Sequence, residues 1–198
     1  MIVEDNLLVQ KLKNGDKEAF DSLYEEYKNV ALRTAFLIVN NQTDSEDIVQ
    51  EAFIKAYLHI RELKNEDGFR PWLFQIVTRT AWNMGKKKSK EVPDEDILLK
   101  ADRLGKKNIL DDLIISEQSL LIRDIINKLD IKYRTVVVLY YYNQFSTREI
   151  AKITECLEGT VKSRLFGARK MIKNALGTME QEEFSYEELR TINQTNIM

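Results

Sequence analysis

Residues 146–176 read STREIAKITECLEGTVKSRLFGARKMIKNAL, and this stretch decides the fold that the sequence predicts. Ser146 and Glu149 have the spacing of a capping box, which begins a short helix through Ile153. A turn over 154–157 separates it from a second helix, expected over 158–176. That helix is basic, and its inward stripe at helical spacing consists of Val161, Leu165, Ala168 and Ile172. The pattern predicts a helix-turn-helix unit.

A helix-turn-helix unit binds duplex DNA through its second helix. The first residues of that helix reach base edges in the major groove, while lysines and arginines contact phosphates. A helical hairpin with a solvated basic face has the same bare pattern. The DNA-binding unit and the simple hairpin can be distinguished only from residues outside this stretch.

The composition of the whole chain is that of a helical protein. Hydrophobic residues make up 43% of the 198 residues, which is enough to bury a core. Only 7 glycines and 2 prolines are present, too few for a sheet protein with many turns. The net charge of −2 gives no sign of nucleic-acid binding, because opposite charges are sorted into different segments of the chain.

Several classes of protein are disfavoured by what the sequence lacks. The single cysteine, Cys156, excludes an internal disulfide and a cysteine-based metal cluster, and His59 is the one histidine. No apolar run approaches the roughly 18 residues of a membrane span, and the acidic beginning is not a secretory signal. We expect a soluble cytoplasmic protein without membrane insertion, with no cofactor, no metal site and no catalytic role, since no nucleophile–base pair or phosphate-binding glycine loop is found.

Amphipathic helices are expected on both sides of a less regular segment. In the first half, apolar spacing predicts helices over 17–38, from Asp44 to Ile60, and from Pro71, which suits a first helical turn. In the second half, one helix is expected from Glu117 and another over 133–142, where Val136–Val138 would also suit a strand. The prediction is an all-α protein with two small helical domains on a flexible linker. Its segments are domain 1–90, linker 91–116, helix-turn-helix domain 117–177 and acidic tail 178–198.

A family resemblance accompanies these patterns. Residues 158–165, EGTVKSRL, closely resemble the promoter-upstream-reading helix of the extracytoplasmic-function (ECF) sigma factors. Residues 129–139, LDIKYRTVVVL, are similar to the family's L-P-x-x-Y-R-x-V-x-x-L approach helices. By this resemblance the second domain contacts the −35 promoter element through Glu158, Thr160, Lys162, Ser163, Arg164, Phe166, Gly167, Arg169 and Lys170. The family often has glycine in the turn, where this chain has Glu155, which lacks glycine's freedom at positive φ.

The first half carries two more motifs of this family. Residues 44–56, DSEDIVQEAFIKA, resemble its core-binding helix, and the resemblance implies that an acidic stripe meets a basic coiled coil of the largest polymerase subunit through Asp44, Asp47, Gln50 and Glu51. Residues 69–74, FRPWLF, resemble the F-x-x-W-L element of the helix that captures melted −10 DNA, here with Arg79, Asn83, Lys86, Lys87 and Lys88. A solvated acidic face is the simpler interpretation of the stripe. Trp82 suits either base stacking or packing, and packing is favoured.

The resemblance implies a sigma factor that binds core RNA polymerase and directs promoter-specific transcription initiation. Its expected partners are core RNA polymerase, promoter DNA and an anti-sigma factor. The alternative is a stand-alone helix-turn-helix regulator that binds DNA without polymerase. That alternative accounts for residues 117–176 and leaves the motifs of the first half unexplained.

Overall fold

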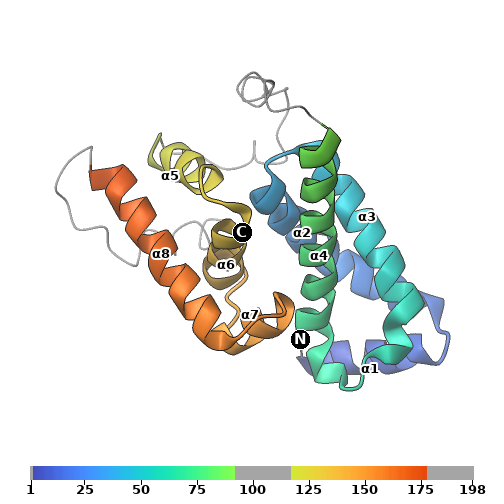
Figure 1. The fold of residues 1–198 in the computed structure, drawn as a ribbon. Helices are drawn as coiled ribbons and strands as arrows, with labels where there is room; N and C mark the ends of the chain where they lie inside the picture. Colours follow the sequence, from blue (N-terminus) through green and yellow to red (C-terminus); the bar gives the residue numbers. More distant parts are fainter. Residues whose placement is uncertain (1, 92–116, 178–198) are drawn as a thin grey trace.

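The computed structural model describes residues 2–91 and 117–177, and within these ranges all regular structure is helical (Figure 1). The all-α prediction is therefore confirmed. The acidic tail, and the expected linker apart from residue 91, lie outside the described residues. The helices are α1 (Ile2–Lys13), α2 (Lys17–Val39), α3 (Gln42–His59), α4 (Phe69–Glu91), α5 (Glu117–Asn127), α6 (Ile131–Val137), α7 (Thr147–Ile153) and α8 (Glu158–Gly177), with short turns η1 (Ile60–Glu62), η2 (Glu66–Gly68) and η5 (Val138–Tyr142).

Residues 2–91 form a first unit in which α1, α2, α3 and α4 pack on one another. The Asp16 side chain accepts hydrogen bonds from the backbone N–H groups of Glu18 and Ala19 and so begins α2. The Asn41 side chain accepts one from the Asp44 backbone and begins α3. The expected start at Asp44 is therefore wrong, because Asn41 caps the helix and places Asp44 in its first turn.

Residues 117–177 form a second unit, and its helix-turn-helix matches the sequence prediction. Ser146 and Glu149 make the expected capping box, with each side chain bonded to the backbone of the other. Val136–Val138 are helical and buried, so a strand there is wrong. The Asp130 side chain caps α6, which continues into η5, a wider helical turn of the π type.

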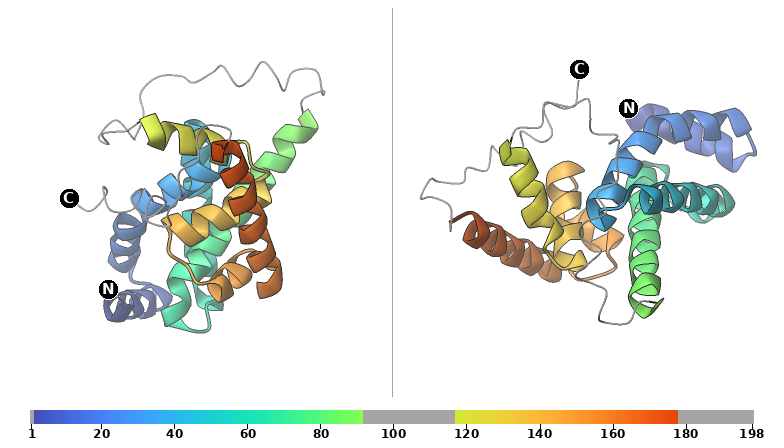
Figure 2. Two further views of the ribbon diagram at one scale, coloured as in Figure 1. Left: turned by 90° about the vertical axis from the view of Figure 1, so that its left-hand side faces the viewer. Right: turned by 90° about the horizontal axis from the view of Figure 1, so that it is seen from above.

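The two units pack against each other and share one hydrophobic core (Figure 2). The ring of Phe74 on α4 meets the ring of Phe145 edge to face, with centroids 5.4 Å apart. The Arg70 guanidinium lies over the Phe145 ring at 4.4 Å. Figure 1 shows α6 and α7 between α8 and α4, while α3 lies on the far side of α4. A smaller cluster of buried aliphatic side chains joins α5, α6 and α8.

Polar side chains bridge the two units beside this core. Arg134 on α6 donates to the backbone oxygens of Ile38 at 2.9 Å and Leu129 at 3.0 Å, and also to that of Asn127. Burial lowers the pKa of Arg134, and the negative charge of Asp130 acts in the opposite direction. The guanidinium stays charged, as arginine side chains do in proteins. The amide of Asn143 donates to the buried Thr34 hydroxyl at 2.8 Å. These bonds fix the second unit against α2, while α7 packs on α4.

Candidate nucleic-acid and polymerase interfaces

Helix α3 separates a buried apolar face from an exposed acidic one. Ile48 and Ala52 are fully buried against α2 and α4, whereas Asp47, Gln50 and Glu51 are exposed, and Asp44 is partly exposed. The Glu51 carboxylate lies 2.5 Å from the Lys55 ammonium on the same helix, an exposed pair of small net stabilisation. The structure thus brings the predicted acidic stripe together on one outward surface.

Two large apolar side chains continue this surface. Ile54 is 54% exposed and Leu58 is 67% exposed, at three and seven residues beyond Glu51. Helical spacing puts both on the same side of α3 as Asp47 and Glu51. Neither is among the residues predicted from the sequence, although the signal was present: both fall outside the register of the buried residues of this helix. We call Asp47, Glu51, Ile54 and Leu58 the α3 stripe.

On α4, the candidate residues for single-stranded DNA face a cleft between the two units. Arg79, Asn83 and Lys86 line this cleft of about 270 Å³ together with Trp82. Trp82 is partly buried, and its Nε1 donates to the Thr135 hydroxyl at 3.0 Å, so it packs against the second unit. The side chains of Lys87 and Lys88 lie outside the described residues, although α4 continues through both.

The opposite wall of the cleft comes from the helix-turn-helix. Ile153, Thr154 and Glu155 line it, and Glu155 has a φ of 51°, the left-handed conformation that glycine adopts readily. Its Oε2 lies 3.2 Å from Nη2 of Arg79, and its Oε1 accepts a hydrogen bond of 2.9 Å from Gln75. We call Glu155, Gln75 and Arg79 the clasp. Sequence patterns do not reveal it, because Glu155 is 76 residues from Arg79 and 80 residues from Gln75 along the chain.

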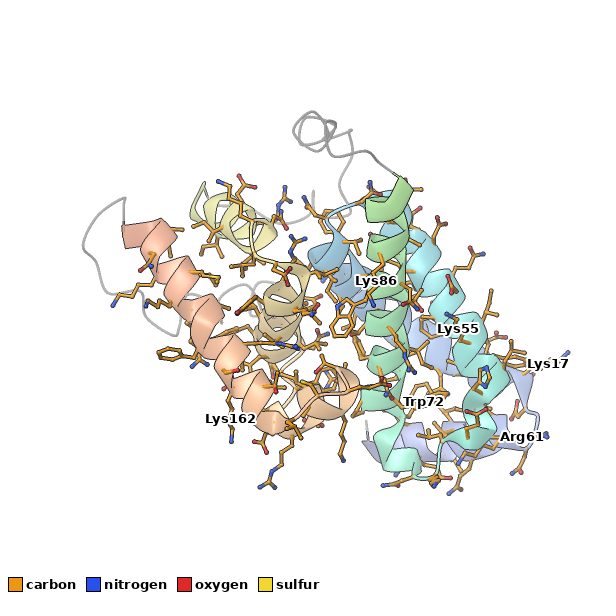
Figure 3. All side chains as sticks on the ribbon, in the orientation of Figure 1. Lys17, Lys55, Arg61, Trp72, Lys86 and Lys162 are labelled. Atoms are coloured by element: carbon orange, nitrogen blue, oxygen red, sulfur yellow. The ribbon has the colours of Figure 1, made fainter. Side chains whose placement is uncertain are left out.

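The candidate residues on α8 divide into two groups. Lys162, Ser163, Phe166 and Lys170 are exposed, and Phe166 is 71% exposed despite its apolar ring. Figure 3 shows Lys162 at the beginning of α8 and Lys86 on α4, so the basic candidate residues belong to two different helices. The other group is Glu158, Thr160, Arg164, Gly167 and Arg169, which are partly buried.

Members of the partly buried group contact their own unit. Arg169 donates through Nε to the Tyr141 hydroxyl at 2.8 Å. A Cβ added to Gly167 would lie 2.9 Å from Cε1 of Tyr133, so packing of α8 on α6 accounts for this glycine. Arg164 lies 3.9 Å from the Cys156 sulfur through Nη1. These contacts fix the orientation of α8 and leave the exposed group facing outward.

Glu158 connects the two helices of the helix-turn-helix. Its Oε1 accepts from the Thr147 hydroxyl at 2.8 Å and lies 2.9 Å from the Lys162 ammonium. The hydrogen bond from Lys162 is the largest cause that lowers the Glu158 pKa, and Thr147 adds to it. As an anion in the first turn of α8, Glu158 also faces the positive end of the helix dipole.

Glu158→Gln should lower the stability of the chain at neutral pH, with the difference lost in acid. A folded-state pKa below the ordinary 4.5 gives stability that is present above that value and is lost as the pH falls through the lowered pKa. The thermal midpoints of the two proteins, measured from pH 7 to pH 3, should therefore converge below about 4.5. A difference that stays constant over this range would contradict the role given to the Glu158 charge.

Comparisons with known proteins cover both units. The family model described as "Sigma-70 region 2" matches residues 23–91, and "Sigma-70, region 4" matches residues 119–172. The chain is 35% identical over 182 residues to the ECF RNA polymerase sigma-E factor of Haemophilus influenzae, covering 87% of this chain and 95% of that protein. It is 31% identical over 187 residues to the RNA polymerase sigma-H factor of Pseudomonas aeruginosa, covering 90% and 97%.

Solved structures share this fold. CnrH, in complex with the cytosolic domain of CnrY, matches with a TM-score of 0.65 at 20% identity, covering 89% of this chain and 99% of that one. The sigma factor RpoE from Bartonella quintana, in complex with the anti-sigma factor NepR, matches with a TM-score of 0.67 at 22% identity, covering 81% and 98%. Across the part of the chain that the structure describes, no helix has the length and apolar character to cross a membrane.

Proposed function

The chain belongs to the ECF sigma factors, which act in promoter-specific transcription initiation, and we propose that its helices α3, α4 and α8 divide this task. In the proposal α3 binds core RNA polymerase, α4 captures the melted −10 element, and α8 reads the −35 duplex. The protein acts in the cytoplasm in this proposal and has no catalytic activity of its own. One observation carries the division: the exposed acidic candidates lie on α3, whereas the exposed basic candidates lie on α4 and α8.

Polymerase docking is assigned to the α3 stripe. Acidic side chains attract a basic partner and fix its register, which speeds association more than it adds affinity. The exposed Ile54 and Leu58 supply apolar area that a partner helix can bury at about 25 cal/mol per Å². A stripe with both kinds of side chain fits a helical partner that carries basic and apolar residues along one face.

Capture of melted DNA is assigned to the cleft beside α4. Arg79 and Lys86 provide cations for the phosphates of a single strand, and Asn83 provides an amide that can read the edge of an unstacked base. Because Trp82 donates to Thr135 and is partly buried, its ring serves as a wall of the cleft. Lys87 and Lys88 extend the basic character along the same helix.

Reading of the −35 duplex is assigned to the exposed residues of α8. Ser163 lies in the first half of the helix, where side chains of a recognition helix reach base edges. The exposed Phe166 ring suits an apolar contact with a thymine methyl group. Lys162 and Lys170 suit the phosphates on either side. Glu158, Gly167 and Arg169 support the orientation of α8 through their contacts within the unit.

Lys170→Ala and Phe166→Ala should affect DNA binding in different ways, although both residues are exposed on one helix. Loss of a phosphate contact weakens binding to all sequences and reduces the salt slope by about 1. Loss of the apolar contact should weaken binding to the preferred duplex by about 1–3 kcal/mol, the usual cost of one mismatched base pair, and should change binding to other duplexes little. The measurement is binding of the chain with core polymerase to a set of −35 duplexes at several salt concentrations. Equal losses on every duplex for Phe166→Ala would contradict the assignment.

The experiment that tests the function as a whole is run-off transcription. Purified core polymerase should initiate at specific promoters from a library when the chain is added, and should not do so without it. Specific DNA binding that needs no polymerase, together with no specific initiation, would favour a stand-alone regulator instead.

CnrH is bound to the cytosolic domain of CnrY in its structure, and RpoE is bound to the anti-sigma factor NepR. We propose that an anti-sigma factor also binds the present chain. Addition of such a partner should suppress initiation.

A further inference from the structure

The turn of the helix-turn-helix occupies space that melted DNA would need. Ile153, Thr154 and Glu155 face Arg79 and Lys86 across the cleft of about 270 Å³. These two cations are the ones assigned above to strand phosphates. A strand that lies along this side of α4 would have to displace the turn, because protein atoms wall the cleft on both sides.

The chemistry of Glu155 matches that of the missing strand. A carboxylate beside a guanidinium uses the same charge-assisted hydrogen bonds as a phosphate. Glu155 Oε2 lies 3.2 Å from Arg79 Nη2, where a phosphate oxygen would bind. The residue adopts a φ of 51°, which is disfavoured for side chains with a Cβ and which glycine adopts without penalty. A glutamate in this turn is therefore unfavourable for the backbone, and the contacts with Arg79 and Gln75 offset that cost.

We propose that the clasp masks the DNA-capture cleft in the free chain: Glu155 stands in for a DNA phosphate on Arg79, and the strand can bind only after the second unit moves away from α4. The inference rests on the proposed role of α4 in DNA capture. The larger share of the closed packing comes from the buried contacts, including Phe74 with Phe145 and Asn143 with Thr34. The clasp adjusts the closed equilibrium at the edge where DNA binds.

The size of its effect follows from exposure. The Arg79 and Glu155 side chains are 65% and 49% exposed, and an exposed ion pair shifts an equilibrium by only a few fold. A ligand that binds only the open form has its apparent affinity reduced in proportion to the open fraction. Any change in the clasp therefore appears directly in the affinity for single-stranded DNA, even when the open form is rare.

Four full-length proteins test the mask: the natural chain, Glu155→Gly, Gln75→Lys and the double variant. The measurement is binding of a labelled single-stranded oligonucleotide by fluorescence anisotropy at low salt, where exposed pairs act most strongly. Glu155→Gly removes the carboxylate and suits the turn, so affinity should rise by about two- to fivefold. Gln75→Lys places an ammonium beside Glu155 and strengthens the closed form, so affinity should fall by about two- to fivefold.

The sign of the Gln75→Lys effect separates masking from simple attraction. An added cation near a DNA site raises affinity by electrostatics alone. Under the proposal the Gln75→Lys substitution lowers affinity when Glu155 is present and no longer lowers it when residue 155 is glycine. A rise in affinity on Gln75→Lys substitution in both backgrounds would overturn the mask.

Hydrogen exchange of the α7 backbone gives a readout that does not need DNA. Exchange should slow on Gln75→Lys substitution when Glu155 is present and should not slow when residue 155 is glycine, in step with the DNA affinities, because both report the open fraction. Equal exchange and equal DNA affinity in all four proteins would overturn the mask while leaving the DNA site in place. No DNA binding by any of the four would instead remove the role of α4 in DNA capture, and the mask with it.

Discussion

Replacing both Asp47 and Glu51 with lysine should lower the affinity of the chain for core RNA polymerase by about 100-fold, since facing like charges costs several kcal/mol at an interface. Both residues are exposed on α3, and the buried face of that helix is untouched by the change. The fold should therefore be kept. Binding of labelled chain to core polymerase at several salt concentrations measures the effect, which should weaken as salt rises.

A matched control lies on the neighbouring helix. Glu25 and Glu26 are exposed acidic residues of α2 and not members of the α3 stripe, and changing both to lysine alters the net charge by the same amount. This control should bind polymerase as the natural chain does. Equal losses in the two double variants would show that overall charge, and not the α3 stripe, governs docking. Thermal unfolding of both variants checks that neither loss comes from the fold.

Phe145→Ala should lower the free energy of unfolding by about 3–5 kcal/mol, the usual cost of emptying a buried phenylalanine site. Phe145 is 2% exposed and lies between Phe74 and Arg70 of the first unit. The substitution removes an edge-to-face ring contact and a cation–π contact as well as apolar area. Phe145→Leu keeps most of the volume and should cost much less, so it serves as the control.

Tryptophan fluorescence turns this substitution into a test of the shared core. Trp72 belongs to the first unit and Phe145 to the second, and because Trp82 contacts Thr135 of the second unit, the measurement is made in a Trp82→Phe background. If the two units stabilise each other, tryptophan fluorescence should follow the loss of stability in a urea titration. If they fold independently, fluorescence should keep its midpoint while helical circular dichroism shifts. The second result would contradict the coupling that the packing implies.

Local features of this fold could be predicted from the sequence, and long-range ones could not. The capping box of Ser146 and Glu149 depends on residues three apart, and the structure confirms it. Asp44 and Asp47 have the spacing of a capping box and predict that α3 starts at Asp44, yet the Asn41 side chain makes the capping bond. The helical state of Val136–Val138 depends on the Asp130 cap and on tertiary burial, which outweigh their preference for strands.

The candidate sites show the same division. Spacing on one helix was enough to place Asp47, Gln50 and Glu51 on an exposed face. It could not show that Gly167 lies against Tyr133 of another helix, or that Glu155 reaches Arg79 across the cleft. Contacts of this kind depend on how the two units pack, and a single sequence carries no period that records them. Their roles in binding stay predictions.

The position of Arg134 has a consequence for recombining parts of such proteins. Its one guanidinium bonds the ends of helices in both units, so neither unit is complete as a module. Because the acceptor on α2 is a backbone oxygen, an upstream-reading half moved into a relative can re-form this bond only where the relative's α2 ends at the same position against α6. The end of α2 is therefore the place to match when a crossover point is chosen between two such proteins.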